Sequence, residues 1–125
     1  MSFAADLAKF PSATSVTVKS EGGAATTNLQ QGLAKCWGHF EGSDATLDDS
    51  FNSASLTDNG TGDFSANFTN NMGSVSYTGS FQSDDASNTN ASAFATSSIR
   101  IQTRNSVNSA ADRDDTIYTT FGDLA

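Results

Sequence analysis

Apolar side chains fall on alternate positions over most of this chain from residue 34 onward. In residues 34–41, one alternating set is small or apolar and the other carries larger polar and aromatic groups. The first set comprises Ala34, Cys36, Gly38 and Phe40, and the second comprises Lys35, Trp37 and His39. Because successive side chains of a β-strand point to opposite faces, this period of two predicts a strand with one buried face.

A turn signal follows at residues 58–63. Asn59 and Gly60 lie between two apolar runs, and Asn-Gly at the centre of a tight turn predicts a β-hairpin, because both central residues need positive φ. After the turn, three residues share one face of a further strand: Phe64, Ala66 and Phe68. Before the turn, Phe51 and Leu56 fall out of phase, which predicts a bulge or a bend between them.

The second half of the chain continues the pattern with strands expected at residues 75–81, 91–104 and 116–121. In the first of these, one face carries Val75, Tyr77, Gly79 and Phe81. In the second, one face carries Ala93, Ala95, Ile99 and Ile101, and the other carries Phe94, Arg100 and Arg104. Polar loops at 84–90 and 105–115 separate the strands. Six or seven short strands with polar turns predict an all-β fold, a small antiparallel β-sandwich with a jelly-roll-like arrangement.

The first 27 residues predict a short N-terminal arm, and the sandwich is expected over residues 28–125. Phe3, Leu7 and Phe10 are spaced for one face of a short helix over residues 2–10, which Pro11 would end. Three further segments follow: a short strand at 15–19, a Gly/Ala/Thr connector at 21–27, and a turn or brief helix at 28–32.

Composition makes an oligomer the expectation. Val, Leu, Ile and Phe together account for only 22 of the 125 residues, and the net charge is −8. These values approach the range of disordered chains, but the alternation and the turn signals indicate a folded one. Apolar surface buried between subunits would complete a marginal core.

The acidic charge is concentrated after residue 40. Residues 1–40 carry a net charge of +1, whereas residues 41–125 carry −9. Phosphate backbones and anionic bilayers are attracted by clustered Lys and Arg, so we expect neither a nucleic-acid partner nor insertion into a membrane.

The residues that usually carry catalysis are few or unpaired in this sequence. His39 is the only histidine, which excludes a multi-histidine zinc site within one chain, and no G-x-S-x-G elbow occurs. Cys36 is the only cysteine and fits a small buried strand residue in a reducing compartment. Three pairs of adjacent carboxylates occur: Asp48-Asp49, Asp84-Asp85 and Asp114-Asp115. Adjacent side chains point to opposite faces of a strand, and in a loop they usually point into solvent, so these pairs do not indicate paired catalytic carboxylates. We therefore expect no catalytic site and no cofactor.

Calcium is the metal alternative that stays open, at residues 58–63. This segment is similar to the start of an oxygen-rich calcium loop, but Thr69 occupies the twelfth position, where an acidic residue is expected. The chemistry of a hairpin turn accounts for the same residues without an ion, and we favour that interpretation.

Residues 29–68 resemble one kind of viral module. The resemblance is carried by LQQGLAK at 29–35, Trp37, FEG at 40–42, DSFN at 49–52 and above all SLTDNGTGDF at 55–64. These strings are similar to the β-rich module of tail-fibre and related appendage proteins of tailed bacteriophages, especially marine ones. The resemblance extends more weakly over 28–125, and FGDLA at 121–125 resembles the closing strand of such modules.

This resemblance implies a structural protein of the virion, made in the cytoplasm of the bacterial host, rather than an enzyme. It also implies a homotrimer that assembles with other virion proteins and contributes to host recognition, although the chain lacks the long shaft of a typical fibre. The runner-up function is a capsid or tail decoration protein, a cement protein without host contact. A small carbohydrate-active enzyme finds no support.

The polar loops are the candidates for contact with a bacterial surface glycan or outer-membrane protein, because loops on rigid sheets commonly carry binding. The candidate receptor-facing residues are Asp84, Asp85, Asn88, Asn90, Asn105, Asn108, Asp112 and Asp114. Three aromatic residues are candidate anchors for a ligand: Trp37, Tyr77 and Tyr118. Phe3, Leu7 and Phe10 are the candidate residues for attachment of the arm to the virion.

Overall fold

The computed structural model describes residues 17–20, 22–84 and 88–125. The chain divides into two compact units, residues 1–33 and 34–125. The predicted arm, 1–27, falls within the first unit. The helix expected at 2–10 lies outside the described residues, as do the proposed attachment residues Phe3, Leu7 and Phe10.

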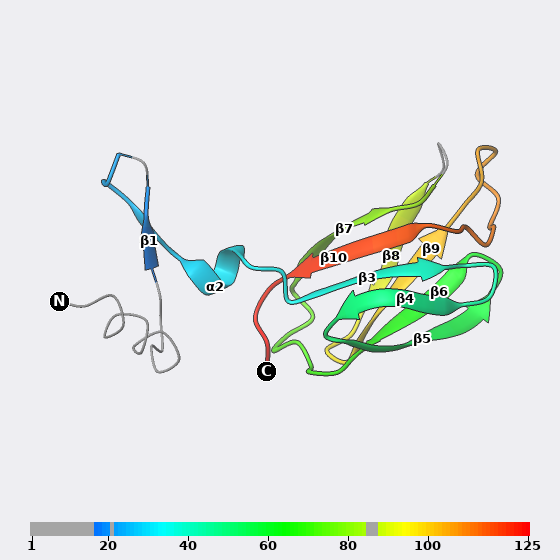
Figure 1. Ribbon diagram of the computed structural model, residues 1–125, viewed down its shortest axis with the longest axis horizontal. Helices are drawn as coiled ribbons and strands as arrows, with labels where there is room; N and C mark the ends of the chain where they lie inside the picture. The colour runs from blue at the N-terminus through cyan, green and yellow to red at the C-terminus, as the bar shows by residue number, and fades with distance from the viewer. Residues whose placement is uncertain (1–16, 21, 85–87) are drawn as a thin grey trace. The chain divides into compact units, whose positions relative to one another are not determined.

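The described part of the first unit is a hairpin followed by one helical turn (Figure 1). Strand β1, Thr17–Lys19, pairs antiparallel with β2, Thr26–Asn28, and α2 spans Leu29–Gly32. The strand expected at 15–19 is thus confirmed over its described residues. The end predicted for the connector, at residue 27, is wrong, because β2 already begins at Thr26. Gly23, at φ 67°, turns the chain, and the β-branched threonines at 26 and 27 then form the strand.

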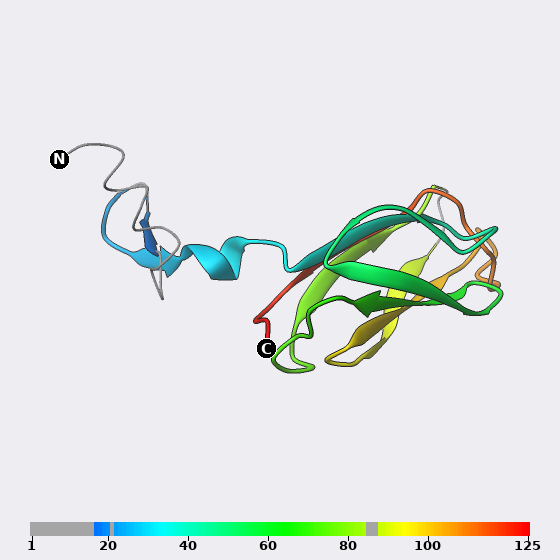
Figure 2. The ribbon, with the colours of Figure 1, turned by 60° about the horizontal axis from the view of Figure 1, so that its bottom comes forward.

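The second unit is a sandwich of two antiparallel sheets, and the all-β prediction is confirmed. One sheet has the order β4-β3-β10-β7 and the other β5-β6-β9-β8. The first sheet comprises β3 (Cys36–Glu41), β4 (Thr46–Phe51), β7 (Thr78–Gln82) and β10 (Thr116–Phe121). The second comprises β5 (Ser53–Gly60), β6 (Asp63–Phe68), β8 (Thr89–Phe94) and β9 (Ser98–Thr103). Figure 2 shows the sheets as two layers, a division that a jelly roll shares.

The core lies between the inner faces of the two sheets. Alternate residues of β3 are buried as predicted, and Phe40 is fully buried. Its ring lies 5.1 Å, centroid to centroid, from that of Phe64 on β6, so it packs across the two layers. Ala66, Ile99 and Ile101 are also fully buried on the second sheet. Each large apolar side chain buried in this way contributes about 1.5–3 kcal/mol to stability.

The chain crosses from the first sheet to the second at Asn52, where the sequence predicts a bulge or a bend. Asn52 has φ 58°, a conformation that Asn tolerates better than most residues. Its side-chain amide donates to the carbonyls of Lys35 (2.9 Å) and Asn70 (3.0 Å), and its Oδ1 accepts from the backbone N–H of Asn70 at 2.7 Å. The predicted bend is therefore confirmed, and one side chain ties it to two other segments.

The hairpin between β5 and β6 is confirmed, but its turn lies two residues later than predicted. Gly60 pairs with Asp63, so Thr61 and Gly62 form the turn. The carboxylate of Asp58 accepts a hydrogen bond from the N–H of Gly60 at 2.8 Å, beside a register shift in the strand. This local bond keeps Asn59 and Gly60 at the end of β5, and Gly62, at φ 65°, supplies the positive φ that the turn needs.

The strand expected over 91–104 is wrong as a single element, because the chain folds there into the β8–β9 hairpin. The turn at 95–97 is held from outside: the N–H of Phe68 donates to the carbonyl of Ser97, and that of Met72 donates to the carbonyl of Thr96, both at 2.8 Å. A register shift between Ala91 and Ala93 reverses the phase of β8. Ile99 and Ile101 are buried as predicted, whereas Ala93 and Ala95 are exposed.

The strand expected at 75–81 begins only at Thr78. Tyr77 is buried in the core and Phe81 is partly buried against it, in agreement with the predicted face. Val75 is 54% exposed and lies outside any strand, so its assignment to that face is wrong. The polar loop at 105–115 and the closing strand at 116–121 are confirmed.

Candidate functional site

The connections between strands gather the polar loops at one end of the sandwich. This loop end comprises the β3–β4 turn (42–45), the β5–β6 turn (61–62), the described residues of the β7–β8 connection (83, 84 and 88) and the β9–β10 connection (104–115). The opposite end, here called the base, holds the start of β3, the crossover at Asn52, residues 69–77 and the β8–β9 turn. The described residues of the two loops proposed to face a receptor therefore lie at the same end, away from the start of β3 (Figure 1).

Three hydrogen bonds hold the β9–β10 connection at the loop end. The N–H of Gly62 donates to the carboxylate of Asp112 at 2.7 Å, and the hydroxyl of Thr103 donates to the carbonyl of Ala111 at 2.6 Å. The N–H of Ser43 also donates to the carboxylate of Asp114 at 3.2 Å. These bonds fix the long β9–β10 connection against both hairpin turns.

Several candidate receptor-facing residues hold the loops in shape. Asp112 and Asp114 accept the bonds just described. Asn105 accepts from the backbone N–H groups of residues 107 and 109 at 3.1 and 2.9 Å, and Asn108 adopts φ 63° within the same turn. Asn90 is half-buried in β8, where it pairs with Gln102, so the loop predicted to reach residue 90 ends earlier.

The remaining candidates belong to the β7–β8 connection. Asn88 is exposed at the loop end, and Asp84 is exposed and forms an ion pair with Arg113, with Oδ1 3.2 Å from Nη2. Asp85 lies outside the described residues. Among the described candidates, Asn90 and Asn105 are partly buried, whereas the others are exposed: Asp84, Asn88, Asn108, Asp112 and Asp114.

A cluster that the sequence does not indicate lies beside the loop end, around the only histidine. His39 Nε2 lies 3.1 Å from Asp115 Oδ1, and its Nδ1 lies 3.7 Å from Asp48 Oδ2. Glu41 follows on the same face of β3. Loss of hydration raises the pKa of the Glu41 carboxyl above its ordinary value, and the nearby charges of Asp114, Asp115 and Asp48 raise it further. The pairing of β3 with β10 creates this cluster, and no spacing in the sequence reveals it.

His39, Glu41 and Asp115 are the described residues able to approach a metal ion together. One ligand atom from each lies within 4.8 Å of the other two. One imidazole and two carboxylates are ligand types that Zn²⁺ and Mn²⁺ accept, and solvent would occupy the open positions.

The carboxylates of the 58–63 segment have partners within the protein. Asp58 caps the N–H of Gly60, and Asp63 accepts from Arg100 Nε at 2.7 Å while also bonding its Nη2. These contacts favour the hairpin interpretation of the segment over a calcium loop.

Of the three candidate aromatic anchors, only Trp37 lies at the surface. Its side chain is 37% exposed on the outer face of β3. Tyr77 and Tyr118 are buried. The Tyr77 hydroxyl donates to the carbonyls of Ala95 and Ser98, and the Tyr118 hydroxyl donates to Ser53 Oγ. Their assignment as anchors is wrong, because both phenols find hydrogen-bond partners inside the fold.

Cys36 is fully buried, as predicted for a small apolar strand residue. Burial raises the pKa of its thiol to about 11, so the thiolate that would act as a nucleophile is scarce at neutral pH.

No helix among the described residues is long and apolar enough to cross a membrane. Comparison with family models, with curated proteins and with solved structures finds no match to this chain.

Proposed function

We propose that this chain is a small structural protein of a bacteriophage virion, a tail-fibre or appendage component that contributes to attachment at the host surface. The observation that carries the proposal is the polarity of the sandwich. The chain enters β3 at the base, whereas the long polar loops gather at the opposite end. A module tethered at one end and displaying loops at the other suits presentation to a target.

The hydrogen bonds of the loop end support this role. Gly62, Thr103 and Ser43 hold the β9–β10 connection in one conformation. A surface ordered before it meets a target loses less conformational entropy on binding. The acidic charge of residues 41–125 favours a neutral or basic target, such as a surface glycan or an outer-membrane protein, over a phosphate-rich one.

The sequence resemblance to phage appendage modules points the same way and adds a homotrimer and neighbouring virion proteins as partners. Light scattering at micromolar concentration should then give three times the mass of the 13.0 kDa chain. A monomer under these conditions would contradict the trimer. Deletion of residues 2–14 should release the protein from the virion while leaving the sandwich folded, because the core residues that the structure describes lie between 36 and 118.

Cell binding tests the attachment role directly. Fluorescently labelled protein should bind host cells, and replacing Asp84 and Asn88 with alanine should weaken that binding. Asn71→Ala is the matched control, because Asn71 is also exposed but lies at the base. If the variant with alanine at residues 84 and 88 and the Asn71→Ala control both bind host cells as well as the unmodified protein does, the loops are not the contact surface, although attachment itself stands.

The decoration protein is the second candidate, and the position on the particle separates the two. Density on the capsid faces, together with no binding to host cells, would overturn the attachment role in favour of a cement protein. Density at the tail or an appendage, with cell binding, is the expected result.

A further inference from the structure

The outer face of the β4-β3-β10-β7 sheet carries exposed aromatic and polar side chains in two neighbouring rows. The register places Phe51, Trp37, Thr119 and Ser80 side by side in the first row. The second row, two residues along each strand, holds Asp49, His39, Ile117 and Gln82. The rows are separated by roughly 7 Å and neighbouring strands by roughly 4.8 Å, so they form a platform several sugar rings wide.

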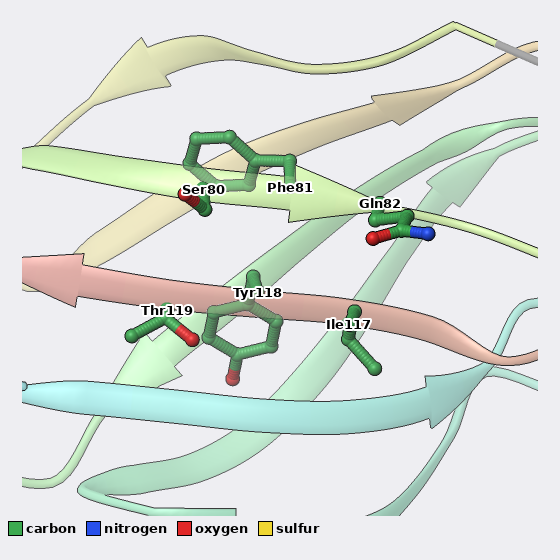
Figure 3. A pocket seen from close by; sticks show the side chains of 6 residues that line it. All are labelled: Ser80, Phe81, Gln82, Ile117, Tyr118 and Thr119. Carbon is green, nitrogen blue, oxygen red and sulfur yellow. The ribbon is translucent and has the colours of Figure 1, made fainter.

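Three apolar side chains of this face are accessible to a ligand. Phe51 is 52% exposed, Ile117 46% and Trp37 37%. Beside Ile117, a shallow hollow of about 240 Å³ lies over β7 and β10 (Figure 3). Ser80, Gln82 and Thr119 supply hydroxyl and amide groups around it. This volume is below the roughly 300–1,000 Å³ of pockets for drug-sized ligands and suits one sugar ring.

We propose that this outer face binds a neutral oligosaccharide, an inference that rests on the proposed attachment function and names the ligand class. The apolar C–H face of a pyranose stacks on the rings of Trp37 and Phe51. Its hydroxyls reach Asp49, His39 and Gln82 in the second row. The apolar face of the sugar thus meets the aromatic rings of the first row, and its hydroxyls meet the polar groups of the second row.

Charge distinguishes this ligand from a second copy of the chain. His39 is flanked by Asp48 and Asp115, and Asp49 is exposed one strand away. Two copies packed through this face would bury these carboxylates and bring like charges together, which is costly. Anionic polymers are disfavoured for the same reason, whereas a neutral sugar leaves the carboxylates hydrated and uses them as hydrogen-bond acceptors.

The single tryptophan provides a reporter for this face. Trp37 is the only tryptophan of the chain, so its fluorescence reports on the outer face alone. The full chain is titrated with neutral oligosaccharides of glucose, galactose, mannose and N-acetylglucosamine, and with hyaluronan oligosaccharides as an anionic comparison. At least one neutral series should shift the emission saturably, and hyaluronan should not.

Calorimetry on variants then locates the site. Trp37→Ala should weaken binding of the active sugar by about tenfold or more, Phe51→Ala should weaken it less, and Trp37→Phe should retain part of the affinity. Val75→Ala at the base is the control, because this position is exposed and apolar but lies off the face. Melting curves identify any variant that fails to fold.

Three results would overturn the inference. They are an emission unchanged by every neutral sugar, equal affinity of the Trp37 and control variants, and a Trp37 emission that shifts only as the chain self-associates. Cell binding is scored separately. If host cells bind the unmodified protein and its Trp37→Ala variant equally, the proposed sugar-binding face is overturned and the attachment function is not. If host cells bind neither protein, the attachment function is overturned.

Discussion

The hydroxyl of Tyr118 donates a hydrogen bond of 2.6 Å to Ser53 Oγ and so links β10 of one sheet to β5 of the other. Gly38 makes room for this ring, because a Cβ at residue 38 would lie 2.6 Å from Tyr118 Cε1. The absence of a side chain at one position therefore allows a contact between the two layers.

We expect Gly38→Ala to destabilise the sandwich by about 1–3 kcal/mol, since the Tyr118 ring is enclosed by the core and cannot move aside. Urea unfolding gives the free energy. Gly32→Ala is the matched control, because a Cβ there meets nothing within 4 Å. Equal stability of the two variants would show that the Tyr118 ring is free to shift.

Gly62 gives a second prediction, at the loop end. A Cβ at this residue would lie 2.4 Å from the carbonyl oxygen of Thr103 and 2.6 Å from the nitrogen of Ala111, at φ +65°. Gly62→Ala should cost about 2–4 kcal/mol through strain and the displaced β9–β10 connection. Gly60→Ala, with positive φ but open space, should cost less, and an equal cost would exclude the steric contribution.

The ion pair between Asp63 and Arg100 predicts that the protein loses stability in acid. The hydrogen bonds from Arg100 hold the pKa of the Asp63 carboxyl below its ordinary value. The folded state thus binds this proton more weakly than the unfolded state. The contribution to stability is complete above the ordinary carboxyl pKa and disappears as the pH falls through the lowered one. Asp63→Asn should destabilise the protein at pH 7 but hardly at pH 2, and a pH-independent difference would contradict this.

For Glu41 we expect stability to change with pH in the direction opposite to that for Asp63. The raised pKa of Glu41 means that the folded state binds the proton more tightly, so stability falls as the pH rises from the ordinary carboxyl pKa through the raised one. Glu41→Gln should therefore raise the melting temperature at neutral pH and leave it nearly unchanged in acid. A lower melting temperature at pH 7 would mean that the ionised carboxylate forms a favourable contact in the folded state.

The inner faces of the strands could be predicted from the sequence because alternation is a local property. Phe40, Phe64 and Ile101 fall on the buried side wherever the period of two is unbroken. The phase of Tyr77, in register with Phe81, already indicated an inward side chain, although its polar hydroxyl suggested a surface anchor. Its burial raises the pKa of that hydroxyl to about 12.

Features that depend on contacts between distant segments could not be predicted. The turn at 61–62 is fixed in part by the distant β9–β10 connection, where Asp112 accepts a hydrogen bond from the N–H of Gly62. The β8–β9 turn is held by N–H groups of Phe68 and Met72. His39 meets Asp115 because β3 and β10 are neighbours, although 76 positions separate the two residues in the sequence.

The place of β3 in its sheet has a mechanical consequence. The first unit joins the sandwich at the start of β3, and β3 is hydrogen-bonded on both sides, to β4 and to β10. If the protein is held at the loop end and pulled through the N-terminus, the load runs along β3 and shears both ladders at once. Many hydrogen bonds must then yield together. We expect single-molecule extension between the N-terminus and the 104–115 connection to require more force than extension between the N- and C-termini.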